Sequence, residues 1–512
     1  MRASPLAVSL AGMLLVAGCA DSSKAEKVAP PTVTVGGASS PAAQSGGAYS
    51  KEGWFGGADG LHARVDIRGV ERQAAKAVLR YSVTSLDSST KSVPFEIALV
   101  DPVGRRLYKP TGTTSGSGFT PGATREMAAE YPPMPTDVQK VTALTPGTAG
   151  EFTGIPVTNA VSSSPSAPST TPSTAPTTPS STPSVGVEPS VGAEPFGRFT
   201  SLTPSPSTSP KTGANPVDLY DIVEGETKDV TSSKSDITLN LRSDVLFDAD
   251  SAKLSSRAKA VLDEAAQQIK AKATRSLTFE GHTDGKGVDS QNFKLSQERA
   301  QAVMTEMKSR LGDDFTYIAR GRGEAEPVAK EGGSDDVAAR ARNRRVEIYY
   351  QVKETTTSGS GGGAAAPAAF HTEDGAKVAS RYGRFGAAKR RIDVKRFYRD
   401  GAYIVAVFDI VNEGPGTTPP DASYPHRDYP GGVFNAFSIQ VPGGKDVYRP
   451  ARVGAGTPGS PSQYVDPGRA VFRTAVHQPV RGFVYMPVPP GKVTSVVFNA
   501  GPFGKVDNVP VS

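Results

Sequence analysis

The distribution of apolar residues divides the chain into segments with different periodicities. Between residues 54 and 161, apolar and polar positions alternate with a period of two, as in Leu61, Ala63, Val65 and Ile67. One face of a half-buried strand requires this spacing. No helical periodicity of useful length competes with it, so residues 54–161 are predicted to form a β-sandwich-like module.

Two helices are predicted between residues 236 and 353, where apolar residues recur every three to four positions. They are Ala258, Val261, Leu262, Ala265, Ala266 and Ile269 in the first helix, and Ala300, Val303, Met304, Met307 and Leu311 in the second. The second helix is predicted to begin near Leu295, with Ser296 as its N-cap. Strand patterns before, between and after these helices give the order β-α-β-α-β-β. This order predicts an α+β domain with helices on one face of a mixed sheet.

Residues 370–512 repeat features of the first module and are predicted to form a second β-sandwich-like module. Arg64-Val65-Asp66-Ile67 has a counterpart in Arg391-Ile392-Asp393-Val394, and Leu107-Tyr108-Lys109-Pro110 has one in Val447-Tyr448-Arg449-Pro450. Order and rough spacing agree, so the outer modules are interpreted as related copies that flank a different central domain. Chance similarity between two proline-punctuated β domains is the alternative.

Two segments contain too few apolar residues to form a core. Residues 162–235 are predicted to be a spacer and lead-in, of which 162 to about 214 is the Ser/Thr/Pro-rich spacer, and residues 354–369 a Gly/Ala linker. Proline-rich chain in the polyproline II form rises roughly 3.1 Å per residue, so the spacer would reach on the order of 150 Å. We therefore expect the spacer to give the central domain its reach.

The N-terminus has the pattern of a lipoprotein signal peptide at residues 1–19, followed by a tether at 20–53. An apolar run is followed by the small pair Ala17-Gly18 and then by Cys19, the only cysteine of the chain. Small residues let a peptidase reach the backbone, and the thiol takes the lipid. A cleaved signal peptide with an incidental cysteine is the alternative. The mature protein is expected outside the cytoplasm, lipid-anchored to the cell membrane or, alternatively, to an outer membrane.

The net charge of +6 comes from basic residues scattered through all modules. No basic helix with interleaved aromatics appears, so no nucleic-acid partner is predicted. The sequence has no nucleophile elbow and no phosphate loop, and no pair of its five histidines has metal-ligand helical spacing. We therefore predict no enzyme, no cofactor and no metal. The alternative is a wall-acting enzyme that uses Asp248, Asp250 and Glu280 as acid/base groups.

Several ordered blocks of the central domain, 236–353, resemble the OmpA-type C-terminal domain. They are Leu246-Phe247-Asp248, Gly281-His282-Thr283-Asp284, Leu295-Ser296 with Arg299-Ala300, Gly321-Arg322-Gly323-Glu324, and Asn343-Arg344-Arg345-Val346-Glu347-Ile348. Several blocks at compatible spacings are more specific than one short motif. The resemblance implies noncovalent binding of the diaminopimelate-containing stem peptide of peptidoglycan, as in the peptidoglycan-associated lipoproteins.

The resemblance also implies roles for single residues, because in that family the aspartate and arginine at positions 284 and 299 contact the diaminopimelate. This end of the ligand presents an ammonium and a carboxylate on one carbon. Asp284 would accept from the ammonium, and Arg299 would offer a planar fork to the carboxylate. With Ser296 as N-cap, Arg299 would lie in the first helical turn, where a cation opposes the helix dipole. From the pattern alone, a turn-capping Asp284 and a solvated Arg299 is the simpler interpretation.

Asn343 and Arg342 are candidates for secondary ligand contacts. The position of Asn343 in the family lines the pocket or fixes the loop beside it, whereas arginines near the last strand also suit solvent. Together these features predict a membrane-anchored lipoprotein that binds peptidoglycan and tethers the envelope to the wall. The alternative is an adhesion or assembly scaffold in which the β modules bind other envelope proteins.

Overall fold

A computed structural model describes residues 49–56, 60–112, 117–160, 215–333, 336–353, 366–416, 423–457, 460–468 and 475–512. Cys19, the signal peptide, nearly all of the tether and the Ser/Thr/Pro-rich part of the spacer lie outside the described residues. Among the helices that the structure describes, none is both long and apolar enough to cross a membrane.

The central domain has the predicted α+β composition and a mixed sheet. Its elements are β13 (Asp236–Arg242), α1 (Ser243–Leu246), α2 (Ala258–Lys272), β14 (Ala273–His282), α3 (Asp289–Leu311), β15 (Thr316–Gly323), α4 (Asp336–Asn343) and β16 (Arg345–Val352). β16 pairs antiparallel with β13 and β14, and β14 pairs parallel with β15. The helices α1 and α4 are additional to the predicted order, since four and eight residues are too short to show a clear apolar period.

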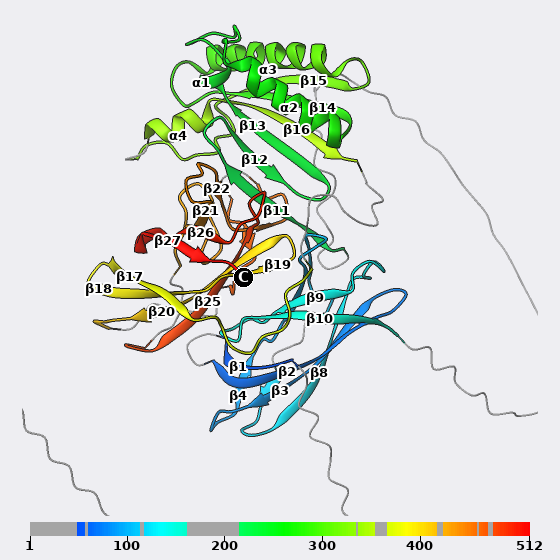
Figure 1. Ribbon diagram of the computed structural model, residues 1–512, viewed down its shortest axis with the longest axis vertical. Helices are drawn as coiled ribbons and strands as arrows, with labels where there is room; N and C mark the ends of the chain where they lie inside the picture. The colour runs from blue at the N-terminus through cyan, green and yellow to red at the C-terminus, as the bar shows by residue number, and fades with distance from the viewer. Residues whose placement is uncertain are drawn as a thin grey trace, which may run out of the picture. The chain divides into compact units, whose positions relative to one another are not determined.

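The helices α2 and α3 lie along one face of this sheet (Figure 1). Leu262 and Ile269 of α2 and Val303 and Met307 of α3 are fully buried, and they share one apolar cluster with strand residues such as Phe279. The apolar stripes seen in the sequence therefore form the contact between helices and sheet.

The predicted start of the second long helix was wrong. α3 begins at Asp289, so Ser296 is not its N-cap but a buried residue within the helix. The Ser296 hydroxyl donates to Phe293 O at 2.8 Å and accepts from Gly323 N at 2.9 Å. The first turns were missed because residues 289–294 are mostly polar and carry no apolar stripe. Arg299 lies roughly three turns from the helix start, so the expected opposition to the helix dipole does not apply.

The flanking modules consist of β-strands. The first contains β1 (Tyr49–Phe55), β2 (Leu61–Arg72), β3 (Ala77–Ser85), β4 (Lys91–Val93), β5 (Ala98–Asp101), β6 (Arg106–Tyr108), β7 (Ser117–Phe119), β8 (Thr124–Tyr131), β9 (Lys140–Leu144) and β10 (Glu151–Asn159). The second contains β17 (Lys377–Phe385), β18 (Ala388–Lys395), β19 (Tyr398–Asp400), β20 (Tyr403–Asn412), β21 (Ser438–Gln440), β22 (Val447–Tyr448), β23 (Arg452–Val453), β24 (Gln463–Tyr464), β25 (Pro479–Pro487), β26 (Ser495–Asn499) and β27 (Lys505–Pro510), with a short 3-10 helix at Gly501–Phe503.

The two modules share an order of strand pairing. The order β1-β2-β3-β8 of the first has the counterpart β17-β18-β20-β25 in the second. The order β6-β5-β9-β10 likewise has the counterpart β22-β21-β26-β27. The motif at 64–67 lies in β2 and its counterpart at 391–394 lies in β18, which are equivalent strands in these orders.

One strand that the sequence did not predict, β11 (Val217–Glu224), pairs with both flanking modules. Val217 pairs with Leu107 of β6, Leu219 pairs with Val453 of β23, and Val223 pairs with Tyr448 of β22. β6 and β22 contain the first two residues of the repeated motifs, so β11 covers equivalent edges of the two modules. β12 (Lys228–Ser232) then pairs with β11 and with β13 of the central sheet.

This pairing changes the expected role of the spacer. The N-terminal side of the spacer is fixed where Ala160 N donates to Arg72 O, and its C-terminal side returns to the same module through β6 and β11. Both ends are therefore attached to one folded unit. The expected reach of the central domain cannot come from this segment, and the lead-in is a pair of strands.

The side chain of Leu219 in β11 packs against both flanking modules. Leu219 is fully buried, in an apolar cluster with Val100 and Leu107 of the first module and Tyr403 and Phe483 of the second. The flanking modules thus share a core that includes a side chain of β11.

Glu224, the last residue of β11, connects the C-terminal module with α4. It accepts hydrogen bonds from Arg449 Nη2 and Tyr429 Oη, each at 2.7 Å, and lies 3.1 Å from Arg342 Nη2. Burial opposes its ionisation, but Arg449 and Arg342 outweigh this effect and lower the pKa of Glu224 to about 2.

We expect Leu219→Ala to destabilise the folded chain by about 2 to 5 kcal/mol, because it removes buried methyl groups and leaves a cavity. Denaturant unfolding measures the loss. Leu86→Ala is the matched control, since Leu86 is 41% exposed and its truncation should cost no more than about 0.5 kcal/mol. Equal stability losses for the two variants would contradict a core role for β11.

We expect Glu224→Gln to reduce the acid sensitivity of folding. Because the folded pKa is lowered from 4.5, the ionised carboxylate contributes stability that is present above about pH 4.5 and is lost as the pH falls toward 2. Between neutral pH and about pH 3, the wild type should lose about 2 kcal/mol more than the variant. Unfolding free energies measured across this range test the prediction, and parallel curves for the two proteins would refute it.

Candidate functional site

Asp284 and Arg299 belong to one charged site at the end of β14. Asp284 follows β14 in the loop to α3, and Arg299 lies on α3. The Asp284 side chain is 12% exposed, and Arg299 is 5% exposed. The carboxylates of Asp250, Asp244 and Asp284 all act on the Arg299 guanidinium. The charges of Asp284 and Arg299, the two residues that the motif predicted, therefore act on each other.

Arg299 is held in place without a carboxylate partner. Its Nε donates to Ser251 O at 2.9 Å, and its guanidinium lies 5.2 Å from the centroid of the Phe247 ring. Among the described residues, no carboxylate forms an ion pair with it. Burial lowers the pKa of Arg299, although the nearby aspartates oppose this shift. A buried guanidinium without an ionic partner is stabilised when a ligand supplies an anionic group.

Asp284 has a cationic partner that the sequence did not assign to the site. Its Oδ2 accepts from Arg344 Nη1 at 2.6 Å, and its Oδ1 accepts from Lys286 N at 3.2 Å. Arg344 also donates to both carboxylate oxygens of Asp244, from Nε at 2.9 Å and from Nη2 at 2.6 Å. These bonds to Asp244 and Asp284 raise the pKa of Arg344. The signal that could have found Arg344 is its place in the Asn-Arg-Arg block.

Asn343 is fully buried and fixes a loop. Its Oδ1 accepts from Val328 N at 3.0 Å and Ala329 N at 2.9 Å, while its Nδ2 donates to Ala329 O at 2.9 Å and Glu331 Oε1 at 2.7 Å. The hydrogen-bonding capacity of this amide is used within the protein. Of the two roles considered for Asn343, the geometry favours fixing the loop over contacting a ligand.

Arg342 lies in the contact with the C-terminal module. It pairs with Asp428 Oδ2 at 2.6 Å, donates to Tyr429 Oη at 2.7 Å and lies 3.6 Å from Asp229. Burial alone would lower its pKa, but Tyr429, Glu224 and the two aspartates raise it. This placement differs from the expected ligand contact, because the guanidinium is already surrounded by acceptors.

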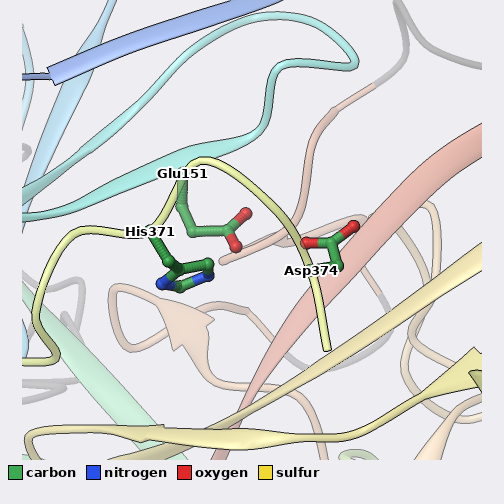
Figure 2. Close-up of side chains that lie close together, drawn as sticks. All are labelled: Glu151, His371 and Asp374. Carbon is green, nitrogen blue, oxygen red and sulfur yellow. The ribbon is translucent and has the colours of Figure 1, made fainter. Parts of the chain in front are cut away.

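Two groups of side chains outside this site have ligand atoms close enough to share a metal ion. In the first, Glu151, His371 and Asp374 offer atoms within 4.8 Å of one another, and the two carboxylates face each other in Figure 2. Arg481 binds both carboxylates, at 2.6 Å to Glu151 and 2.8 Å to Asp374. Since this guanidinium already neutralises the pair, the group is interpreted as a buried ion-pair network between the flanking modules.

The second group is Glu280, His282 and Glu326. Arg322 Nη2 pairs with Glu280 at 2.7 Å. Burial, together with the charges of Arg345 and Arg322, lowers the pKa of His282 to about 2. Two guanidiniums beside these donors repel a further cation, so we assign no metal here. Glu280 is engaged with Arg322, while Asp248 and Asp250 are exposed, so the three carboxylates of the enzyme alternative do not form a shared buried site.

The model of the OmpA family matches residues 246–344. Outer membrane protein A of Bordetella avium is 35% identical over 105 residues, which is 20% of this chain and 53% of that protein. The probable lipoprotein YiaD of Escherichia coli is 32% identical over 130 residues, 25% of this chain and 58% of that protein. The peptidoglycan-associated lipoprotein of Rhizobium meliloti is 33% identical over 115 residues, 22% of this chain and 62% of that protein.

The chain thus spans between about half and two thirds of the length of these relatives. They are proteins of the cell envelope by name, and the matching family is not a catalytic one. The matched segment runs from the end of α1 to Arg344 and contains Asp284, Arg299 and Asn343. Residues 246–344 of this chain are therefore a domain of the OmpA family.

Proposed function

We propose that this chain binds peptidoglycan noncovalently through its OmpA-family domain and tethers the cell envelope to the wall. The observation that carries the proposal is the buried guanidinium of Arg299, which has no carboxylate partner among the described residues and whose charge interacts with that of Asp284. The name of the Rhizobium meliloti relative, peptidoglycan-associated lipoprotein, supports the same ligand.

The ligand group that fits this site is the zwitterionic end of diaminopimelate in a stem peptide. Its carboxylate would accept from Arg299, and its ammonium would donate to Asp284. Charge-assisted bonds of this kind contribute about 1.5 to 3 kcal/mol each. Asp244 keeps Arg344 paired through two bonds, so Asp284 can accept from the ligand while Arg344 retains a carboxylate partner.

The proposed anchor is a lipid on Cys19. A single acyl chain binds a membrane only marginally, whereas a diacyl modification holds stably. The protein would then be extracytoplasmic and lipid-anchored to the cell membrane, or to an outer membrane in the alternative. The relatives include an outer membrane protein and a probable lipoprotein by name, which supports a place in the envelope.

We expect the double variant Asp284→Ala, Arg299→Ala to lose binding to cell-wall sacculi, with an affinity at least about tenfold lower than that of the wild type. Purified protein carrying Cys19→Ser is incubated with sacculi, which are then sedimented. The matched control is Arg275→Ala, Asp313→Ala, which removes the same two charges from exposed positions of the same domain. Cosedimentation of all three proteins to the same extent would exclude the proposed site.

Measuring the binding of all variants at increasing salt concentration distinguishes binding at the site from general cationic adhesion. Attraction between exposed charges is screened at high salt, whereas attraction by partly buried charges is screened less. Binding that disappears for every variant alike as salt is raised would indicate adhesion through net charge instead of binding at Asp284 and Arg299.

We expect Cys19→Ser to move the protein from the membrane fraction to the soluble extracytoplasmic fraction, because the serine hydroxyl replaces the thiol that takes the lipid. Fractionation and metabolic labelling with a fatty acid measure this change. Fatty-acid label that persists on the variant would contradict an anchor at Cys19.

A further inference from the structure

The loop that carries Asp284 is held by side chains from other parts of the chain. Gly285 N donates to Glu331 Oε1 at 3.1 Å, and Lys286 O accepts from Asn292 Nδ2 at 2.9 Å. Asn292 is further fixed by Glu324, whose Oε2 accepts from Nδ2 at 2.7 Å. The ligand loop, defined as residues 283–287, therefore depends on acceptors and donors outside itself for its position.

Glu331 accepts a hydrogen bond from the backbone of Gly285, the residue that follows Asp284. The same oxygen, Oε1, accepts from Gly285 N and from Asn343 Nδ2. The carboxylate packs closely enough that a Cβ at position 285 would lie 3.3 Å from Glu331 Oε2. No lysine or arginine among the described residues forms an ion pair with it. Glu331 thus acts through hydrogen bonds and joins the ligand loop to the buried amide of Asn343.

The backbone beside Glu331 is held from the other side by the C-terminal module. Arg427 Nη2 donates to Glu331 O at 3.1 Å, and Asp428 Oδ1 accepts from Lys330 N at 3.0 Å. Asp428 is itself fixed by Arg342, at 2.6 Å. The segment 330–331 therefore lies between the ligand loop and residues 427–428, with direct hydrogen bonds to both.

We propose that Glu331 is a positioning residue for ligand binding, through which the C-terminal module holds the Asp284 loop in its binding geometry. The inference rests on the proposed function of the Asp284 and Arg299 site and deepens it by naming what controls that site. Its physical basis is preorganisation, because a loop that is already ordered loses less conformational entropy when the ligand binds.

The test compares four variants in the full chain carrying Cys19→Ser. Glu331→Ala removes both hydrogen bonds of Oε1, whereas Glu331→Gln removes the charge but keeps an oxygen acceptor. Arg427→Ala removes the contact from the C-terminal module. Glu264→Ala is the matched control, since this glutamate is 64% exposed on α2. The probe is a soluble muropeptide that contains diaminopimelate, and its Kd is measured by calorimetry.

We expect Glu331→Ala to weaken muropeptide binding about tenfold and Arg427→Ala to weaken it several-fold. Glu331→Gln and Glu264→Ala should remain within about twofold of the wild type. Wild-type affinity in Glu331→Ala overturns the proposal. Equal losses in Glu331→Ala and Glu331→Gln also overturn it, because they would make Glu331 a direct charge contact for the ligand.

Hydrogen exchange of the unliganded protein tests the same inference without a ligand. The amide of Gly285 should exchange faster in Glu331→Ala and Arg427→Ala than in the wild type, and at an unchanged rate in Glu331→Gln. An unchanged rate in both alanine variants overturns the proposed positioning. Absence of muropeptide binding in the wild type, together with this exchange pattern, would overturn the proposed function while leaving the loop contact in place.

Discussion

The arrangement of the described chain depends on β11, which pairs with an edge of each flanking module. β11 covers β6 of the first module and β22 and β23 of the second, and Leu219 contributes to a core that both modules share. An unpaired edge strand presents free backbone donors and acceptors, and proteins usually cover or interrupt such edges. Here the single strand β11 supplies hydrogen-bond partners to equivalent edges of two modules that have the same strand order.

Arg299 differs from several buried charges that lie at the contacts between modules. At these contacts Arg481 is paired with Glu151 and Asp374, and Glu224 is paired with Arg449. Such pairs compensate for the removal of their charges from water. Arg299 is as buried as these groups yet lacks a carboxylate partner among the described residues, which favours a role toward a group that is not part of the chain.

The sequence predicted those features that depend on local pattern. The stripes of α2 and α3 predicted both long helices, and the block containing Asp284 was correctly predicted to lie at a strand end. Ser296 was assigned wrongly as a cap because the polar start of α3 has no apolar period. Arg344 and Glu331 were not found, since their significance depends on Asp244 and Gly285, which are 100 and 46 positions away. The pairings of β11 were not predicted for the same reason, because its partner strands are far away in the sequence and no local pattern identifies them.

The return of the chain from the spacer to β6 determines how the fold tolerates changes in the length of the spacer. A segment whose two ends are fixed on one folded unit is a closed loop, and the entropy of closing a loop grows only with the logarithm of its length. Insertions or deletions of Ser/Thr/Pro repeats between residues 161 and 214 should therefore cost little in stability. A single backbone cleavage there would leave two fragments that stay associated through β11 and the shared core.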